Sequence, residues 1–478
     1  MSDLDRYSSP LAERYASDAM LELWSPRTRY GLWRRLWLAL AEAQQSLGAD
    51  IPAAAVAQMR DHLDEIDFDA VAAYERRFRH DVMAHIHAFA DVAPAARPYI
   101  HLGATSAFVT DNADLILMRR GMDLLRAKVL TVIRALAAFA REWRDTPTLG
   151  YTHLQPAQLT TVGKRATLWM QDLVLDVAEL DRRIATLPFR GVKGTTGTQA
   201  SFLELFAGDH ARVRELERRV TSSMDFTEAL PVTGQTYTRK IDAHVLGAVT
   251  GIAASAAKFS GDIRMLQAFG ELEEPFESEQ VGSSAMAYKR NPMRSERIAS
   301  LARFVISLES NASHTHSVQY LERTLDDSAN RRLAIPESFL ATDAILLLMA
   351  NIASGLHVNT GRVRERLARE LPFMATEEII LAAVRAGGDR QDVHEVIRRH
   401  SVAAAKALSE GADRNDLFDR LARDPALDVP LDQIRAAAAP ERFIGRSAQQ
   451  VDEFLSEVVE PLLAAAGATA DAPGEIRV

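Results

Sequence analysis

The chain contains no cysteine among its 478 residues, which excludes disulfide bridges and thiolate chemistry but leaves the redox compartment open. It also lacks an excess of positive charge, since 56 Lys and Arg against 65 Asp and Glu give a formal net charge of −9. Nucleic acids and membrane surfaces favour proteins with a basic face, so neither is expected as a partner.

Long hydrophobic runs are missing as well. The longest, around 344–356, is too short to span a bilayer, and the N-terminal MSDLDRYSSPLAERY carries charges where a secretory signal needs an apolar core. We therefore expect a soluble protein of the cytoplasm. With 478 residues, 47% of them hydrophobic, the chain is long enough for two or three domains.

The apolar residues recur with helical spacing. Over 115–143 they alternate in steps of three and four residues, which is a heptad pattern. We expect Asp111 or Asn112 to cap this helix at its N-terminus and Pro147 to end it. A second helix is predicted over 159–187.

Further helices are predicted over 236–269, 294–318 and 336–356, the last with Pro336 at its first position, where a missing N–H is tolerated. No segment alternates convincingly in the manner of a strand. Helices of about thirty residues with coiled-coil spacing cannot bury both faces in one small domain. We therefore expect bundle packing and association between subunits.

The stretch 282–296, GSSAMAYKRNPMRSE, concentrates hydroxyl, amide and cationic side chains in irregular backbone. Small residues let main-chain N–H groups approach an anion closely, so such a loop can hold a carboxylate or a phosphate. The simpler interpretation is a solvated basic loop that leads into a helix near Arg294. Spacing alone favours neither interpretation.

This stretch closely resembles the signature loop of the fumarase/aspartase superfamily, and within it that of the adenylosuccinate lyase family. The matching residues are Ser283, Ser284, Met286, Lys289 and Asn291. Other segments that are similar to the same family follow in the family's order: RHDVMAHIHAF (79–89), HLGATSAFVTDNADL (101–115), YTHLQPAQLTTVGKR (151–165), GVKGTTGTQASF (191–202), TGQTYTRK (233–240) and ERTLDDSANRR (322–332).

The resemblance implies an all-α, three-domain fold. By analogy, 1–105 is an N-terminal helical domain, 106–358 is a central long-helix bundle that carries the loop 282–296 and forms the core of a homotetramer, and 359–478 is a C-terminal helical domain. The resemblance also implies active sites shared between subunits, a nucleotide substrate, and no cofactor or metal. The family removes fumarate from adenylosuccinate and from succinylaminoimidazole carboxamide ribotide.

The reaction breaks a C–N bond after a proton is taken from the carbon next to a carboxylate. It needs a base, an acid and donors that hold the developing dianion. The resemblance assigns the base to Ser283, the general acid to His153, and the carboxylate donors to Lys289 and Asn291. Without the resemblance, Ser283 would be interpreted as a turn residue. His153 would be one of 13 histidines, most of which are expected at the surface or in the core.

The substrate-binding residues are carried over in the same way. Arg79, His80 and Asp81 contact substrate in the family, and His80 orients a carboxylate or the general acid. The resemblance places succinyl donors at Thr105, Ser106 and Gln235, and phosphate or nucleotide contacts at Arg14, Tyr15, Arg297, Arg323, Ser328 and Arg332. Without the resemblance, these would be helix caps and ion-pairing arginines.

Two other classes of protein compete with this assignment. A metal enzyme could use Asp326 and Asp327, or His85 and His87, but the histidines fall on different faces of a helix and no second acidic cluster complements the aspartates. A non-catalytic scaffold would need only the heptads and would release no fumarate.

Within the superfamily, argininosuccinate lyase, fumarase and aspartase share the loop. The phosphate-side arginines and the Arg-His-Asp motif favour the nucleotide substrate. One position departs from the family pattern, because Ala287 stands where proline is usual, and this makes the open loop more flexible.

Overall fold

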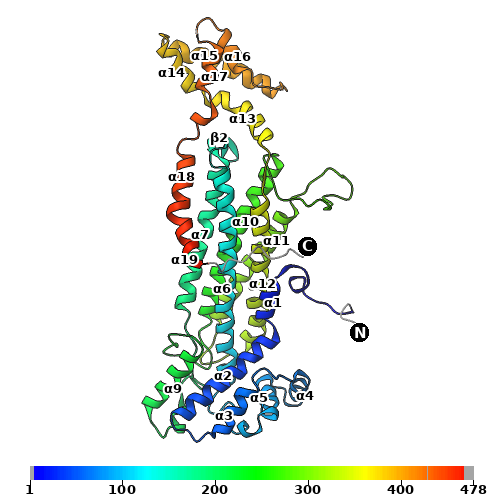
Figure 1. Cartoon of the computed structure of the whole chain (residues 1–478), viewed down its shortest axis with the longest axis vertical. Helices are drawn as coiled ribbons and strands as arrows, with labels where there is room; N and C mark the ends of the chain where they lie inside the picture. The colour runs from blue at the N-terminus through cyan, green and yellow to red at the C-terminus, as the bar shows by residue number, and fades with distance from the viewer. Residues whose placement is uncertain (1–4, 428, 468–478) are drawn as a thin grey trace.

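The computed structural model describes residues 5–427 and 429–467. Long helices lie side by side in the middle of an elongated chain, with groups of shorter helices at both ends (Figure 1). The predicted all-α class is confirmed.

The central bundle consists of α6 (Ser106–Glu142), α7 (Val162–Thr186), α10 (Lys240–Ala268), α11 (Met293–Ser317) and α12 (Asp326–Gly355). The heptad positions predicted over 115–143 face its interior, and Leu125, Val129 and Leu136 are fully buried. The bundle is therefore held by the apolar seam that the sequence displays.

The end of the bundle where α6 begins carries the N-terminal helices, together with α8 (Ala200–Leu205) and α9 (His210–Ser223) (Figure 1). Side-chain caps define several of these helices: Ser17 accepts the N–H of Met20, and Asp67 that of Ala70. The N-terminal elements are a π-helical turn (Leu11–Tyr15), α1 (Asp18–Leu23), α2 (Pro26–Ser46), α3 (Ala53–Asp61), α4 (Phe68–Phe78), α5 (Asp81–Val92) and a 3₁₀ turn (Pro94–Ala96).

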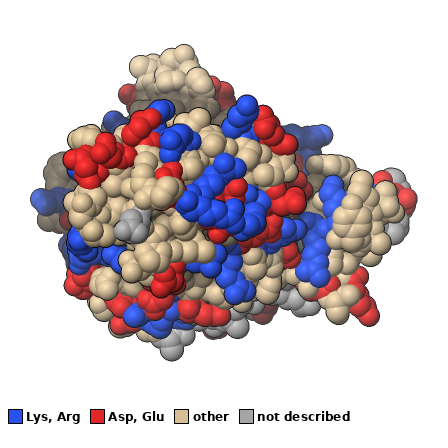
Figure 2. Space-filling view, turned by 90° about the horizontal axis from the view of Figure 1, so that it is seen from above, with Lys and Arg blue, Asp and Glu red and all other residues tan. Residues whose placement is uncertain are grey.

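The opposite end carries a separate small core, built by α14 (Thr376–Arg385), α15 (Arg390–Ser409), α16 (Leu417–Arg423) and α17 (Leu431–Ala437). Viewed from this end, basic and acidic side chains lie interspersed (Figure 2), which is typical of a solvated surface.

The connecting α13 (Thr360–Met374) precedes this core. The chain then returns along the bundle through a 3₁₀ turn (Pro440–Arg442), α18 (Ser447–Phe454), a π-helical segment (Leu455–Val459) and α19 (Glu460–Ala466). The domain limits 1–105, 106–358 and 359–478 stay a prediction, and 468–478 lie outside the described residues.

The expectation that no strand is present is wrong. β1 (Pro147–Thr152) and β2 (Gln155–Thr161) form an antiparallel hairpin, and β3 (Leu272–Glu273) pairs with β4 (His357–Val358). The hairpin lies where α6 ends, at the far end of the bundle from α5 (Figure 1). Pro156 lies within β2, and proline in a segment argues against a strand, so the sequence pattern did not indicate the hairpin.

Some helix boundaries also differ from the prediction. Asp111 and Asn112 do not cap α6, which begins at Ser106, and both are buried inside the helix. The helix ends at Glu142, before the hairpin that begins with Pro147. The helices predicted over 236–269 and 294–318 are confirmed as α10 and α11.

Pro336 lies inside α12 and not at its first position. This helix, at 30 residues, is long and apolar enough by composition to cross a membrane, but 78% of its most apolar window is buried within the fold. That degree of burial is typical of the core helix of a bundle.

Candidate active site

A cavity of about 990 Å³ lies between the N-terminal helices and the end of the bundle where α6 begins. Besides α1 and α2, four segments far apart in the sequence supply its walls: the α4–α5 junction, the start of α6, the loop before α10, and the start of α12 with the loop before it. They bring together these predicted site residues: Arg79, His80, Asp81, Ser106, Gln235, Arg323, Ser328 and Arg332.

The α4–α5 junction presents its polar groups through two helix ends. Arg79 ends α4 in the left-handed conformation with φ of 54°, and the Nδ1 atom of His80 accepts the N–H of Met83 at 3.3 Å to cap α5. Asp81 binds Arg332 of α12 at 2.9 Å. The junction therefore joins two helix ends with charged side chains and also forms a wall of the cavity.

Thr105 and Gln235 meet at the start of α6. The Gln235 amide donates to the Thr105 hydroxyl at 3.0 Å, and the main-chain carbonyl of Gln235 accepts two bonds from the buried Arg190. Gly197 is required beside this loop, because a side chain there would lie 1.8 Å from the carbonyl of Thr233. Two of the three predicted succinyl contacts, Thr105 and Gln235, are thus hydrogen-bonded to each other.

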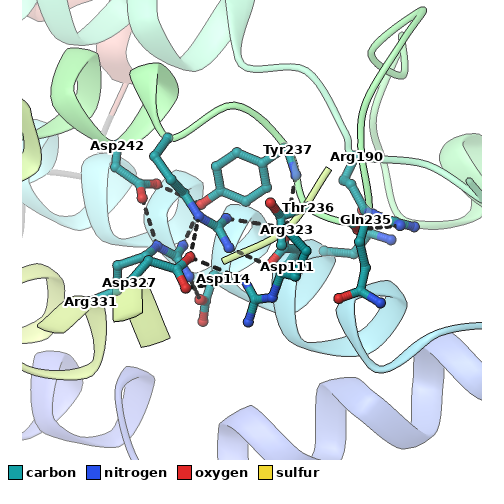
Figure 3. A network of polar contacts seen from close by, with 12 residues as sticks. Asp111, Asp114, Arg190, Gln235, Thr236, Tyr237, Asp242, Arg323, Asp327 and Arg331 are labelled. Carbon is teal, nitrogen blue, oxygen red and sulfur yellow. Dashed lines mark hydrogen bonds and ion pairs between the residues drawn. The ribbon is translucent and has the colours of Figure 1, made fainter. Parts of the chain in front are cut away.

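Beneath these groups lies a buried ionic network that the sequence reading missed (Figure 3). Arg239 binds Asp111 at 3.1 Å and Asp327 at 2.7 Å, and Asp327 also binds Arg323 at 3.1 Å. Burial alone would raise the pKa of Asp111, but Arg239 and Arg331 lower it below its usual value. Arg323 is therefore held in place by Asp327, which is itself bound by the buried Arg239.

The second half of the network fixes α6 against α10 and α12. Arg331 binds Asp242 at 2.7 Å and Asp114 at 3.0 Å, and the Tyr237 hydroxyl donates to Asp242 at 2.6 Å. Burial keeps the pKa of Tyr237 well above its usual value, so its hydroxyl remains a donor. This network gives the cavity a rigid, charge-balanced floor.

The signature loop lies elsewhere, projecting from the side of the bundle before α11 (Figure 1). Asn291 closes its neck by donating to the Gly282 carbonyl at 2.7 Å. The Ser283 Oγ atom accepts main-chain N–H groups from Met286 at 3.1 Å and Ala285 at 3.3 Å, and Lys289 is exposed. Two N–H groups aimed at one hydroxyl oxygen stabilise negative charge on it.

Arg297 follows this loop in α11, and its guanidinium lies 5.4 Å from the centre of the Tyr15 ring. Tyr15 and Arg14 end the π-helical turn at the N-terminus. The predicted phosphate contacts are therefore divided between this group and the cavity, where Arg323, Ser328 and Arg332 lie.

His153 occupies a third place, at the exposed tip of the β1–β2 hairpin. His153 and Leu154 both have positive φ, 53° and 58°, as in a two-residue type I′ turn built without glycine. Non-glycine residues in this conformation are strained and are concentrated at functional sites. The hairpin and the cavity lie at opposite ends of α6, whose 37 residues span about 55 Å.

One chain thus displays three separate sets of polar groups: the cavity wall, the signature loop with Arg297 and Tyr15, and the hairpin tip. The predicted base Ser283 and acid His153 do not line the cavity of their own chain. Together the three sets contain a supported hydroxyl, an imidazole, and fixed donors and cations for an anionic ligand.

Known proteins resemble the chain over almost its whole length. Residues 13–307 match the family model described as "Lyase", and residues 372–454 match the one described as "Adenylosuccinate lyase C-terminus". The chain is 51% identical to adenylosuccinate lyase of Saccharomyces cerevisiae and 49% identical to that of Schizosaccharomyces pombe, in each case over 97% of both proteins.

Solved structures support the fold. The chain superposes on 3-carboxy-cis,cis-muconate lactonizing enzyme from Pseudomonas putida with a TM-score of 0.80 at 22% identity, covering 95% of this chain and 99% of that one. A fumarate lyase from a Mesorhizobium species gives 0.77 at 24% identity, covering 94% and 99%.

Proposed function

Because the chain belongs to the adenylosuccinate lyase family, we propose that it cleaves adenylosuccinate to fumarate and AMP and cleaves succinylaminoimidazole carboxamide ribotide in the same way. It is an enzyme of the lyase class. The observation that carries the proposal is that eight of the predicted site residues, from four distant segments, line one cavity.

In the proposed reaction, Ser283 takes the proton from the carbon next to the succinyl carboxylate. The C–H electron pair forms the new C=C bond, the C–N bond breaks, and His153 protonates the departing nitrogen. The N–H groups of Ala285 and Met286 support the negative charge on Ser283. Lys289 and Asn291 hold the carboxylate whose charge increases in the transition state.

The cavity supplies the remaining contacts. Thr105, Ser106 and Gln235 bind the succinyl group, while Arg323, Ser328 and Arg332 bind the nucleotide end with Arg14, Tyr15 and Arg297. His80, next to Asp81, orients a carboxylate or the acid. Arginine suits the phosphate because its planar fork donates two parallel hydrogen bonds.

We further propose that the enzyme is a homotetramer in which each site draws the cavity, the loop and the hairpin from three subunits. The separation along α6 supports this, because one chain cannot bring His153 to its own cavity. Bundle helices also expose large apolar side chains, including Leu175 on α7 at 61% and Leu333 on α12 at 63%. Such faces become stable when they are covered by another subunit. We place the enzyme in the cytoplasm.

The test is to incubate the purified protein with adenylosuccinate and to follow fumarate and AMP, with and without a metal chelator. Equal release of both products, unaffected by the chelator, is expected. Argininosuccinate, malate and aspartate serve as matched substrates of the wider superfamily. Fumarate release from one of these and not from adenylosuccinate would reject the proposal, and a protein that releases none would be a scaffold.

A further inference from the structure

A buried carboxylate, Glu271, lies behind the hairpin that carries His153, and nothing in the reaction described above uses it. Only 2% of the residue is exposed. Its Oε1 atom accepts the Tyr151 hydroxyl at 2.9 Å and pairs with the Arg366 Nε atom at 2.8 Å. Its Oε2 atom accepts the Thr148 hydroxyl at 3.4 Å and lies 3.9 Å from Arg165.

These partners tie the hairpin to two other parts of the chain. Thr148 and Tyr151 belong to β1. Arg165 lies in the first turn of α7, from which it also donates to the Leu149 carbonyl. Arg366 belongs to α13 and donates to the Tyr151 hydroxyl as well, at 3.0 Å through Nη2. A buried carboxylate stabilises its surroundings only when such partners satisfy it, so the cluster holds the hairpin in one position.

The cluster lies close to the hairpin tip. Tyr151 comes two residues before His153. Directly before Tyr151, β1 has an irregularity at Gly150, where a side chain would lie 2.6 Å from the Gln158 carbonyl. The tip itself is exposed and holds two residues with positive φ. The groups around Tyr151 at the base of the hairpin therefore determine the direction in which the tip projects.

We propose that Glu271 is a positioning residue for the general acid: through Tyr151 and Arg366 it fixes the hairpin so that His153 meets the leaving nitrogen. The inference rests on the proposed role of His153. Proton transfer requires heavy atoms within about 3 Å, and a misplacement of about 1 Å can cost a hundredfold in rate.

The direction of the central hydrogen bond is consistent with this role. Burial raises the pKa of Tyr151, and the hydrogen bonds from Arg366 only partly oppose the rise, so the phenol keeps its proton and donates to Glu271. Tyr151→Phe removes that donor with little change in volume. Tyr74→Phe is a matched control, because the Tyr74 hydroxyl also donates to a carboxylate, Asp91, at 2.9 Å but lies in α4.

The experiment is a double-mutant cycle on turnover. Tyr151→Phe and Tyr74→Phe are each placed in the wild-type and in the His153→Ala enzyme, and kcat and KM are measured for adenylosuccinate. We expect Tyr151→Phe to lower kcat about tenfold with KM within about twofold, and to have no further effect when His153 is absent. Tyr74→Phe should change neither constant.

Equal losses from Tyr151→Phe in both backgrounds would show a general structural role and overturn the proposal, as would unchanged kcat. Glu271→Gln should reproduce the Tyr151→Phe result, and if that variant does not fold, the tyrosine variant still decides.

Hydrogen exchange of residues 147–161 gives a readout that does not depend on turnover. We expect faster exchange in Tyr151→Phe than in the wild type, and equal exchange would overturn the anchoring. A wild-type enzyme that releases no fumarate would instead reject the proposed function, so the two failures are distinguishable.

Discussion

The carboxylate of Asp343 accepts the main-chain N–H of Ser17 at 2.7 Å, although the two residues are 326 positions apart. Lys128 of α6 binds the same carboxylate and donates to the Ser17 hydroxyl at 2.8 Å. Asp343 is fully buried in the apolar α12. The contact fastens the N-terminal segment to the bundle directly after Tyr15, so it also fixes the proposed phosphate contacts.

Removing this carboxylate should cost much stability. Asp343→Ala leaves the ammonium of Lys128 without its buried partner, and we expect a loss of about 3–5 kcal/mol in the free energy of unfolding. Asp64→Ala is the control, because the Asp64–Arg35 pair is exposed and is worth at most about 1 kcal/mol. Thermal unfolding at a fixed protein concentration measures both. Similar shifts in the two variants would contradict the assigned role of the buried pair.

The proton-transfer groups should be essential for turnover and dispensable for binding. Ser283→Ala and His153→Ala should each lower kcat by roughly a hundredfold or more, because each removes one group and leaves most contacts in place. Calorimetric titration with adenylosuccinate checks that it still binds. Ser284→Ala should be much milder, since the main-chain donors point at Ser283. Near-normal turnover in either of the first two variants removes that residue from its role.

The loop should become more rigid when its missing proline is restored. The N–H of Lys289 donates to the Met286 carbonyl at 3.0 Å, which places Ala287 at the second position of a turn, where proline is favoured. Ala287→Pro should slow tryptic cleavage after Lys289 and Arg290 and stabilise the loop by about 0.4–1 kcal/mol. Ala285→Pro should do the opposite, because it removes a donor to Ser283. Cleavage at the wild-type rate, with and without product, would refute this explanation of the departure.

Stability should fall as the pH is lowered toward 4. Burial, aided by Arg34, lowers the pKa of His85 to about 4, although Asp81 opposes this. In the unfolded chain the pKa of His85 is near 6.5, so the unfolded state binds the proton more strongly. Lowering the pH from 6.5 to 4 therefore reduces the free energy of unfolding by up to about 3 kcal/mol through this group. His85→Gln should flatten that part of a plot of unfolding free energy against pH. An unchanged slope would show that folding does not lower the pKa of His85.

The long helices were predictable because heptad spacing is a local property of the sequence. Pro336 misled the prediction for α12, since a proline inside a helix usually ends it. Here the carbonyl that loses its donor belongs to Arg332, which is exposed, so water can satisfy it.

The buried network was harder to foresee. Asp111 lies four residues before Leu115 and therefore on the buried face of α6. This spacing indicates a buried charge, whereas the prediction made Asp111 a helix cap. Its partner Arg239 lies directly before α10, far from Asp111 in the sequence. The two residues meet only when α6, α10 and α12 pack together. The family resemblance, in contrast, named residues from four distant segments that line one cavity in the structure, a proximity that spacing cannot give. Their roles stay a prediction.

The last prediction concerns the division of labour between chains. If each site takes His153 and Ser283 from different subunits, mixing the inactive His153→Ala and Ser283→Ala enzymes should rebuild some sites free of both substitutions. With equal amounts and random exchange, the chance that both positions are wild type is one half times one half, so activity should reach at most about a quarter of the wild-type value.

Each variant taken through the same exchange procedure alone is the control, and native mass measurement shows whether hybrid tetramers have formed. A mixture that contains hybrids yet stays inactive would mean that acid and base come from one chain. That result would require the hairpin and the signature loop to approach each other within a subunit. It would contradict the proposed division of each site among three subunits.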